Sequence, residues 1–224
     1  MDTVSVKKHM ATDFQVTEAI KVLRTNLFFS GNDKRVVALT SYQASEGKST
    51  LALQLAASIA ETGKRVVLVD ADLRKSALAS RLRYRGKPVG LSHYLSGMAN
   101  ADEMLCETDV KGFYMVFSGA RVPNPAELLG ASSFDKLIAA LRDTFDYVIV
   151  DAAPLGQVID AAIIAPKLDG VIMVINAADN SYKNEQRIKH QLERSGGKIL
   201  GVILNRVNLS ELEGYYSKNH YSYD

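Results

Sequence analysis

Short runs of apolar, mostly β-branched residues alternate along this chain with longer segments in which apolar residues recur at helical spacing. The apolar runs cover residues 35–40, 66–72, 113–117, 147–151, 170–176 and 198–206. Helices are expected between them, at residues 51–60, 90–97, 101–105, 126–129, 133–144, 158–167 and 181–195. Apolar runs of this length are typical of buried parallel strands. The alternation predicts an α/β fold, a doubly wound and mostly parallel sheet that binds ligands at the carboxyl ends of its strands.

The first 30 residues divide into a polar segment and an amphipathic helix. Residues 1–15 have no clear period, so we expect a flexible lead-in. Residues 16–30 show apolar positions at helical spacing, with Thr17 as the expected N-terminal cap. The polar side of this helix carries charged residues at three-residue steps: Glu18, Lys21 and Arg24. Taken alone, these three predict no more than a solvated face with weak ion pairs.

Composition narrows the class of protein. The 224 residues are 47% apolar and 23% charged, which suits one α/β domain with a sizeable core. A net charge of +2 argues against general nucleic-acid binding, and the single cysteine, Cys106, fits a reducing cytoplasm. No apolar run approaches the ~20 residues that span a bilayer. We therefore expect a soluble protein that reaches a membrane only through a partner.

The stretch Ala44–Thr50 joins the first apolar run to the helix that follows it, in the order strand, phosphate loop, helix. Backbone N–H groups of such a loop, with the positive end of the helix, form an anion cradle, and Gly47 allows close approach of a phosphate. Lys48 would reach the β- and γ-phosphates and Ser49 would ligate Mg²⁺. Tyr42 replaces the usual first glycine. The expected ATP-binding residues of the loop are Ser45, Glu46, Gly47, Lys48, Ser49 and Thr50.

Carboxylates follow two of the apolar runs. Asp70 and Asp72 end the second run on one face of the strand, and such a pair calls for a cation nearby. Asp151 ends the fourth run, where phosphate-loop proteins place an Asp beside the water shell of the metal. The expected metal-binding residues are Ser49, Asp70 and Asp151. The basic stretch 73–87 is interpreted as a solvated surface, with the alternative that Arg74 and its neighbours face a phosphate or an acidic partner.

The C-terminal end differs in kind from the rest of the chain. Its last residues, 213–224, contain no aliphatic side chain able to dock in a core. Tyrosines are concentrated there: Tyr215, Tyr216, Tyr221 and Tyr223. We interpret residues 1–210 as one domain and residues 211–224 as a flexible tail whose phenols can accept phosphate in a nucleotide site.

Together these motifs resemble the bacterial tyrosine kinases, or BY-kinases, of capsule and exopolysaccharide synthesis. The resemblance covers nearly the whole chain. Within this family, the chain is similar to the form in which the cytosolic kinase is separate from its transmembrane activator. The matching segments are Glu18-x-x-Lys21-x-x-Arg24, Ser45–Thr50, Val67–Arg74, Pro123–Leu129, Val148–Pro154 and the tyrosine cluster.

The resemblance implies a kinase that uses ATP and Mg²⁺ to phosphorylate tail tyrosines of a neighbouring subunit. Lys48, Asp70 and Asp72 are the expected catalytic residues, and either aspartate could orient or deprotonate the phenol. The resemblance also implies that Asn205 and Arg206 lie near the adenine. It further implies a closed ring of subunits joined through Glu18, Lys21 and Arg24, a membrane activator whose cytosolic tail completes the site, and a cognate phosphatase.

Two alternatives share these motifs. Positioning ATPases of the Min and Par class have a similar loop and similar strand-end aspartates, but carry a signature lysine where this chain has Gln43. The second alternative is a catalytically idle module whose bound ATP only stabilises an assembly. Formation of phosphotyrosine from purified protein and ATP distinguishes the kinase from both.

Overall fold

In the computed structural model of the protein, residues 3–207 are described apart from 12, 85, 87 and 179–181. A seven-stranded sheet has the order β3-β4-β2-β5-β1-β6-β7. All neighbouring strands are parallel except the antiparallel pair β3 and β4. The strands are β1 (Val36–Ser41), β2 (Val66–Asp70), β3 (Leu105–Glu107), β4 (Phe113–Val116), β5 (Tyr147–Asp151), β6 (Gly170–Asn176) and β7 (Ile199–Asn205). The predicted doubly wound, mostly parallel fold is confirmed.

Helices of very different length connect these strands. The longer ones are α1 (Phe14–Phe29), α2 (Lys48–Ala60), α7 (Ser132–Thr144) and α9 (Tyr182–Arg194). The shorter ones are α3 (Leu78–Arg81), α4 (Leu91–Leu95), α5 (Ala101–Met104), α6 (Pro125–Gly130), α8 (Asp160–Ile164) and the 3₁₀ turns η1 (Lys7–His9) and η2 (Ala165–Lys167). No helix in the described ranges is both long and apolar enough to cross a membrane.

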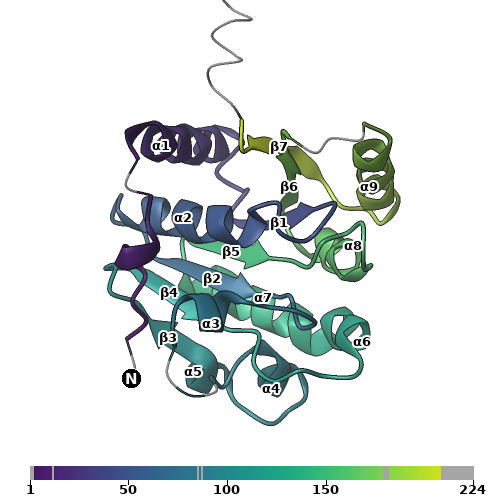
Figure 1. Ribbon diagram of the computed structural model, residues 1–224. Helices are drawn as coiled ribbons and strands as arrows, with labels where there is room; N and C mark the ends of the chain where they lie inside the picture. Colours follow the sequence, from purple (N-terminus) through teal and green to yellow (C-terminus); the bar gives the residue numbers. More distant parts are fainter. Residues whose placement is uncertain (1–2, 12, 85, 87, 179–181, 208–224) are drawn as a thin grey trace, which may run out of the picture.

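The sheet is covered on both faces, which is why its central strands are buried throughout and mostly apolar, with polar residues at their carboxyl ends (Figure 1). Successive residues of β1 alternate between two cores. Val37 and Leu39 pack with α1 and α2, whereas Val36 and Ala38 pack with α7, α8 and α9. Because β2, β5 and β1 are adjacent and parallel, their carboxyl ends meet at one edge of the sheet. The candidate site lies at this edge.

The N-terminal segment is packed rather than flexible, so the predicted lead-in is wrong for its described residues. Val4 and Val6 are buried, and the Val4 N–H donates to the Glu107 carbonyl at 2.8 Å. The Asp109 carboxylate accepts from the Val6 N–H at 2.7 Å and from the Ser5 hydroxyl at 3.0 Å. Only two apolar residues, Val4 and Val6, alternate with polar residues here. A pattern this short cannot be recognised from periodicity.

Helix α1 begins earlier than its apolar pattern suggests. Asp13 is the N-cap, and its Oδ1 accepts from the Val16 N–H at 3.1 Å. The predicted cap, Thr17, is instead inside the helix, where its hydroxyl donates to the Asp13 carbonyl at 2.8 Å. A Thr one turn into a helix commonly makes this bond to the carbonyl four residues earlier.

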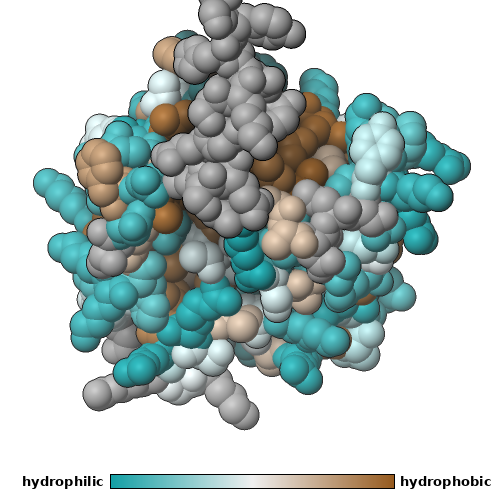
Figure 2. All heavy atoms as spheres, turned by 45° about the horizontal axis from the view of Figure 1, so that its top comes forward, coloured by the Kyte–Doolittle hydropathy of each residue, from teal (hydrophilic) through white to brown (hydrophobic). Residues whose placement is uncertain are grey.

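Apolar side chains gather in patches on one face of the molecule, seen as brown areas among mostly hydrophilic side chains in Figure 2. The exposed large apolar residues include Phe14, Val22 and Phe29 on α1, and Val202 and Leu204 on the edge strand β7. Contiguous exposed apolar side chains often mark a protein interface. The predicted tail, residues 211–224, lies outside the described residues.

Candidate nucleotide site

The phosphate loop connects β1 to α2 and is held in place by residues at the carboxyl end of β7. Gly47, at the N-cap of α2, has φ of 93°, a left-handed conformation that favours glycine. A side chain at this position would collide with the Asn205 amide nitrogen, 2.1 Å from the ideal Cβ. Asn205 Nδ2 donates to the Glu46 carbonyl at 2.8 Å, and Arg206 Nη2 donates to the Ser45 carbonyl at 2.6 Å. The carboxyl end of β7 therefore braces the loop.

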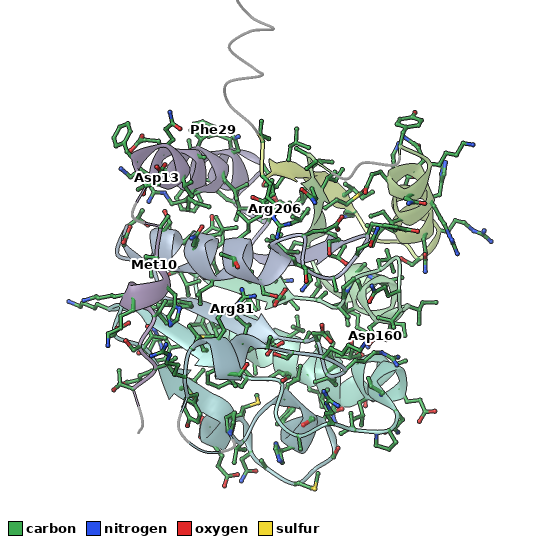
Figure 3. All side chains as sticks on the ribbon, in the orientation of Figure 1. Met10, Asp13, Phe29, Arg81, Asp160 and Arg206 are labelled. Atoms are coloured by element: carbon green, nitrogen blue, oxygen red, sulfur yellow. The ribbon has the colours of Figure 1, made fainter. Side chains whose placement is uncertain are left out.

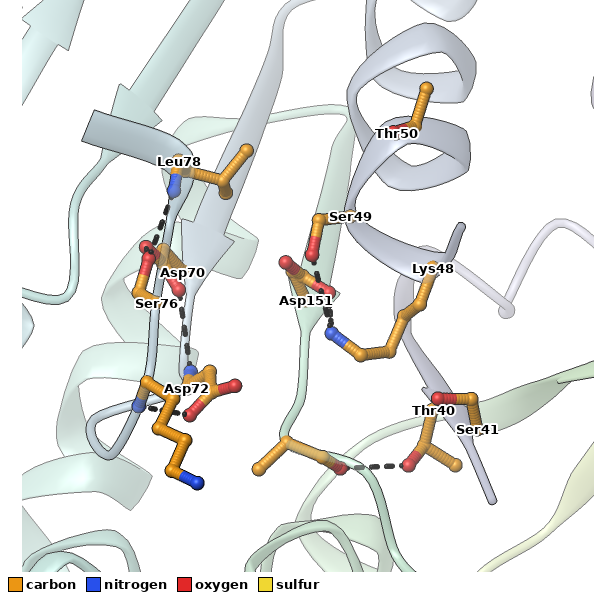
Figure 4. Close-up of polar contacts among 12 residues, drawn as sticks. Thr40, Ser41, Lys48, Ser49, Thr50, Asp70, Asp72, Ser76, Leu78 and Asp151 are labelled. Carbon is orange, nitrogen blue, oxygen red and sulfur yellow. Dashed lines mark hydrogen bonds and ion pairs between the residues drawn. The ribbon is translucent and has the colours of Figure 1, made fainter. Parts of the chain in front are cut away.

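Lys48 lies under the loop beside the end of β5. Its ammonium nitrogen is 2.5 Å from Asp151 Oδ1 and 3.3 Å from the Ser49 hydroxyl (Figure 4). Lys48 and Asp151 are 6% and 1% exposed. A buried ammonium at a phosphate loop is a point charge suited to the terminal phosphates of a nucleotide. The structure thus brings together three of the predicted site residues, Lys48, Ser49 and Asp151.

Asp70 ends β2 directly opposite Asp151 in the parallel register. Its carboxylate is 1% exposed, accepts from the Ser76 hydroxyl, and accepts from the Asp72 N–H at 3.3 Å. Burial, and then the negative charge of Asp151, raise the pKa of Asp70 to about 7. Two carboxylates at adjacent strand ends are stabilised in their ionised form by a cation between them.

Asp72 lies in the loop after β2, which we call the aspartate loop (residues 70–76). Its Oδ1 accepts from the backbone N–H groups of Arg74 and Lys75, at 3.2 and 2.9 Å. This turn around an Asp side chain is a common way of fixing a loop. Unlike Asp70, Asp72 is only partly buried and lines a cavity.

The cavity has a volume of about 380 Å³ and lies between the phosphate loop and the aspartate loop. One wall carries Lys48 and Ser49, the other carries Asp72 and Arg74, and Asp151 lines it as well. The segment after β5 completes it with Pro154, Gln157 and Val158. The cavity therefore places the ammonium group of Lys48 and the carboxylate of Asp72 at one site.

The residues present fit a magnesium ion. Mg²⁺ prefers hard oxygen ligands and keeps several waters or phosphate oxygens when it binds proteins. The Ser49 hydroxyl and the carboxylates of Asp70 and Asp151 are donors of this kind. Within the described ranges no three His, Cys, Asp or Glu side chains gather into a metal cluster. Substrate phosphates would have to complete the ligand set, as is usual for magnesium at nucleotide sites.

The predicted oligomerisation residues make different contacts. Lys21 and Glu18 are paired on the surface, with Nζ 2.7 Å from Oε1. Arg24 turns toward α2, where its Nη1 donates to the carbonyl and the hydroxyl of Ser58 at 2.8 and 3.0 Å. Arg24 therefore has an additional contact within its own subunit, and the role of all three residues in oligomerisation stays a prediction. The long Arg side chain reaches the neighbouring helix because α1 packs on α2.

Sequence reasoning missed several charged partners of the site. Arg74 belongs to the basic stretch interpreted as solvated, yet its guanidinium pairs with Asp160 at the start of α8. Arg81 Nη1 donates to the Thr50 hydroxyl at 2.6 Å. The position of Arg74 two residues after Asp72 was the one available signal, whereas nothing in the sequence singled out Asp160.

Comparison with known proteins agrees with this geometry. Residues 37–218 match the family described as the CobQ/CobB/MinD/ParA nucleotide binding domain. The fold and the cavity therefore define a phosphate-loop nucleotide-binding protein. MinD from Pyrococcus horikoshii, solved with Mg-ADP, has a TM-score of 0.66 and 24% identity, covering 79% of this chain and 72% of that one. A likeness at this level shows the fold alone.

More similar proteins define the family more narrowly. The tyrosine-protein kinase CpsD of Streptococcus agalactiae is 42% identical over 86% of this chain and 84% of its own length. The putative tyrosine-protein kinase CapB of Staphylococcus aureus is 28% identical over 90% of this chain and 89% of its own. The solved BceF tyrosine kinase domain has a TM-score of 0.80 and 30% identity, covering 90% of this chain and 82% of that one. The chain belongs to the family of bacterial tyrosine-protein kinases, which confirms the predicted family and class of activity.

Proposed function

We propose that this chain transfers the γ-phosphate of ATP to tyrosines in the C-terminal tail of a neighbouring subunit, and to tyrosines of other proteins. One observation carries the proposal: Lys48, Asp72 and Asp151 line a single cavity in a chain whose relatives are tyrosine-protein kinases. The acceptors in the tail are Tyr215, Tyr216, Tyr221 and Tyr223.

Each charged group has a separate task in this proposal. Lys48 and the amides of the phosphate loop stabilise negative charge on the transferred phosphoryl group. Ser49, Asp70 and Asp151 would hold Mg²⁺, which would neutralise phosphate charge when bound. Asp72 orients or deprotonates the phenol, because it lines the cavity whereas Asp70 is buried behind Ser76. Asn205 and Arg206 hold the loop and, by family resemblance, lie near the adenine.

The setting of the reaction rests on the family resemblance. In this proposal a transmembrane activator of polysaccharide synthesis binds the kinase through its cytosolic tail and recruits it from the cytoplasm to the inner face of the membrane. Unphosphorylated subunits form a ring, and a tyrosine phosphatase reverses the modification. The kinase thereby regulates synthesis and export of a capsular polysaccharide or exopolysaccharide.

Incubating the purified protein with ATP and Mg²⁺ tests the reaction. We expect phosphotyrosine in the tail, located by mass spectrometry. ATP hydrolysis without phosphotyrosine would favour a positioning ATPase, and nucleotide binding without either reaction would favour an idle assembly module.

Transfer between subunits is tested by mixing two defective proteins. One lacks residues 211–224, and the other carries Lys48→Met but has an intact tail. Phosphotyrosine on the Lys48→Met protein shows transfer between chains. A mixture that stays unmodified, while the wild type is modified, would contradict transfer in trans.

A further inference from the structure

A bidentate ion pair closes one side of the candidate site. Arg74 Nε donates to Asp160 Oδ2 at 2.7 Å, and Arg74 Nη2 donates to Asp160 Oδ1 at 2.9 Å. This fork geometry fixes both the distance and the orientation of the guanidinium. Asp160 is the first residue of α8 (Figure 3). The pair therefore connects the aspartate loop to a helix from a different part of the chain.

Asp160 is much more deeply buried than the carboxylate of an ordinary surface ion pair. It is 1% exposed, whereas the Arg74 side chain is 36% exposed. A buried carboxylate is costly unless it is paired and hydrogen-bonded. In the described part of the chain, both hydrogen bonds to its side chain come from Arg74. The burial of Asp160 thus depends on keeping Arg74 in place.

Arg74 is in turn part of the structure that holds Asp72. The backbone N–H of Arg74 donates to Asp72 Oδ1, and so does the N–H of Lys75. Asp72 and Arg74 both line the cavity, on the wall opposite Lys48. If the Arg74 side chain were released, the backbone amides that orient the Asp72 carboxylate would lose one of their anchors to the fold, while the bond from Ser76 to Asp70 and the buried side chain of Leu73 would still hold the rest of the loop.

We propose that Asp160 is a positioning residue for phosphoryl transfer: it holds Arg74, and through Arg74 it fixes the Asp72 carboxylate at the cavity. This inference rests on the proposed role of Asp72 and identifies the residues that hold the Asp72 carboxylate in position. A carboxylate on a loop must be held in a narrow range of positions, since a displacement of about 1 Å can cost about 10²-fold in rate. Asp160 touches neither ATP nor the phenol in this scheme.

The same chain contains a matched pair away from the cavity. Arg142 Nη1 and Nη2 donate to the two oxygens of Asp169 at 2.9 and 2.8 Å. Asp169 also accepts from the backbone N–H groups of Arg35 and Val36, at the amino end of the strands. Asp169→Asn therefore disrupts a comparable pair, with additional structural bonds, at the opposite edge of the sheet from Asp72.

The test compares Asp160→Asn with Asp169→Asn in the full chain. Asp160→Asn should lower kcat for tyrosine phosphorylation by about 10- to 100-fold, while the Kd for ATP changes less than threefold. Asp169→Asn should lower the melting temperature at least as much, yet keep kcat within threefold of the wild type. Equal kcat losses in both variants would reduce Asp160 to a stability role and overturn the proposal. A parallel loss of ATP affinity in Asp160→Asn would also overturn it.

A second readout does not depend on kinase activity. Hydrogen exchange of the peptide spanning residues 72–77 should accelerate in Asp160→Asn and in Arg74→Lys, because Lys cannot reproduce a bidentate contact. Exchange in the phosphate loop should stay unchanged. Unaltered exchange at 72–77 would refute the positioning role even if the wild type proved to be a kinase. Conversely, a wild type that forms no phosphotyrosine would contradict the proposed function while leaving this structural result to stand.

The double variant Arg74→Ala/Asp160→Asn completes the test. If Asp160 acts through Arg74, the two substitutions should not add: kcat of the double variant should equal that of Arg74→Ala. Multiplied losses would show that Asp160 acts by another route. The double variant also removes the unpaired buried charge, so it stays folded if a single variant does not.

Discussion

The ammonium nitrogen of Lys48 lies 2.5 Å from Asp151 Oδ1, and both side chains are almost completely buried. Lys48 begins α2 and Asp151 ends β5, so two neighbouring elements each contribute one charge beneath the phosphate loop. Charges buried in this way stabilise a protein only as a pair, because either one left alone is uncompensated. Phosphates bound in the cavity would compete with Asp151 for the ammonium group.

Lys48→Met should abolish most tyrosine phosphorylation and also destabilise the protein. Losing one electrostatic donor typically costs ~10²–10³ in rate. The protein is destabilised because the substitution leaves Asp151 buried without its partner. Breaking a buried pair from one side typically costs about 3–5 kcal/mol. Phosphotyrosine blotting and thermal unfolding of the monodisperse variant measure the two effects.

The double variant Lys48→Met/Asp151→Asn is the control for that stability effect. It should recover much of the lost melting temperature while remaining inactive. Near-wild-type phosphorylation in Lys48→Met would sink the assignment of Lys48. A double variant less stable than Lys48→Met would show that Asp151 is compensated in another way.

Asp70→Asn and Asp72→Asn should differ in what they retain. Both should lose phosphorylation, but Asp72→Asn should still bind ATP with Mg²⁺, since Asp72 acts on the phenol in our proposal. Asp70→Asn should weaken the magnesium dependence of nucleotide binding. Titrating a fluorescent ATP analogue with and without Mg²⁺ measures this, and full activity in Asp72→Asn would mean that the base lies elsewhere.

Glu185 predicts a specific pH dependence of stability. One of its carboxylate oxygens, Oε2, is buried without a hydrogen-bond partner among the described residues. Burial, and then the charge of Glu46 in the phosphate loop, raise its pKa from 4.5 to about 7. Between these values the folded protein keeps a proton that the unfolded chain has lost. The contribution of Glu185 to stability therefore falls as the pH rises from about 4.5 through about 7.

Glu185→Gln removes this titration and is nearly isosteric. The melting temperature of the variant, minus that of the wild type, should increase between pH 5 and pH 8. Other titrating groups, including Asp70, are present in both proteins and cancel in the difference. A difference that is the same at both pH values would rule out a raised pKa of Glu185.

The strands and the phosphate loop could be predicted because the residues that define them are close together in sequence. An apolar run that ends in Asp70 or Asp151 identifies both a buried strand and the edge where its ligand binds. Parallel neighbours then bring the two carboxylates together without any further information. This part of the site follows from local sequence and the topology of doubly wound folds.

The missed features depend on partners that are distant in sequence. Asp109 accepts hydrogen bonds from the amides of Val6 and Lys7, more than 100 residues away in the sequence. The segment predicted to be a flexible lead-in is therefore packed against the domain. The short strand β3 was not predicted because it spans only three residues, Leu105–Glu107, and the helix expected at residues 101–105 included the first of them. The ion pair of Arg74 with Asp160 spans 86 positions. No periodicity in one sequence encodes such contacts.

The outward side of α1 predicts how subunits associate. Phe14, Val22 and Phe29 are 76%, 58% and 83% exposed on this helix, and the Glu18–Lys21 pair lies among them. Exposed phenylalanines at these fractions are costly in water and favour an interface. A contact between this surface and a different surface of the next subunit would close into a ring or continue as a filament. The family resemblance favours the ring.

Light scattering separates the role of this surface from that of Arg24. Phe14→Ser/Phe29→Ser and Glu18→Ala/Lys21→Ala should yield monomers with an unchanged melting temperature. Arg24→Ala should instead lower the melting temperature, because Arg24 bonds Ser58 on α2. Phosphorylated wild type should also dissociate, since each phosphotyrosine adds about −1.5 to −2 charges to a tail that already carries Glu211, Glu213 and Asp224.

An identical mass for the wild type and all variants would refute association through α1. Undiminished tail phosphorylation in a variant shown to be monomeric at high dilution would mean that transfer occurs within one chain.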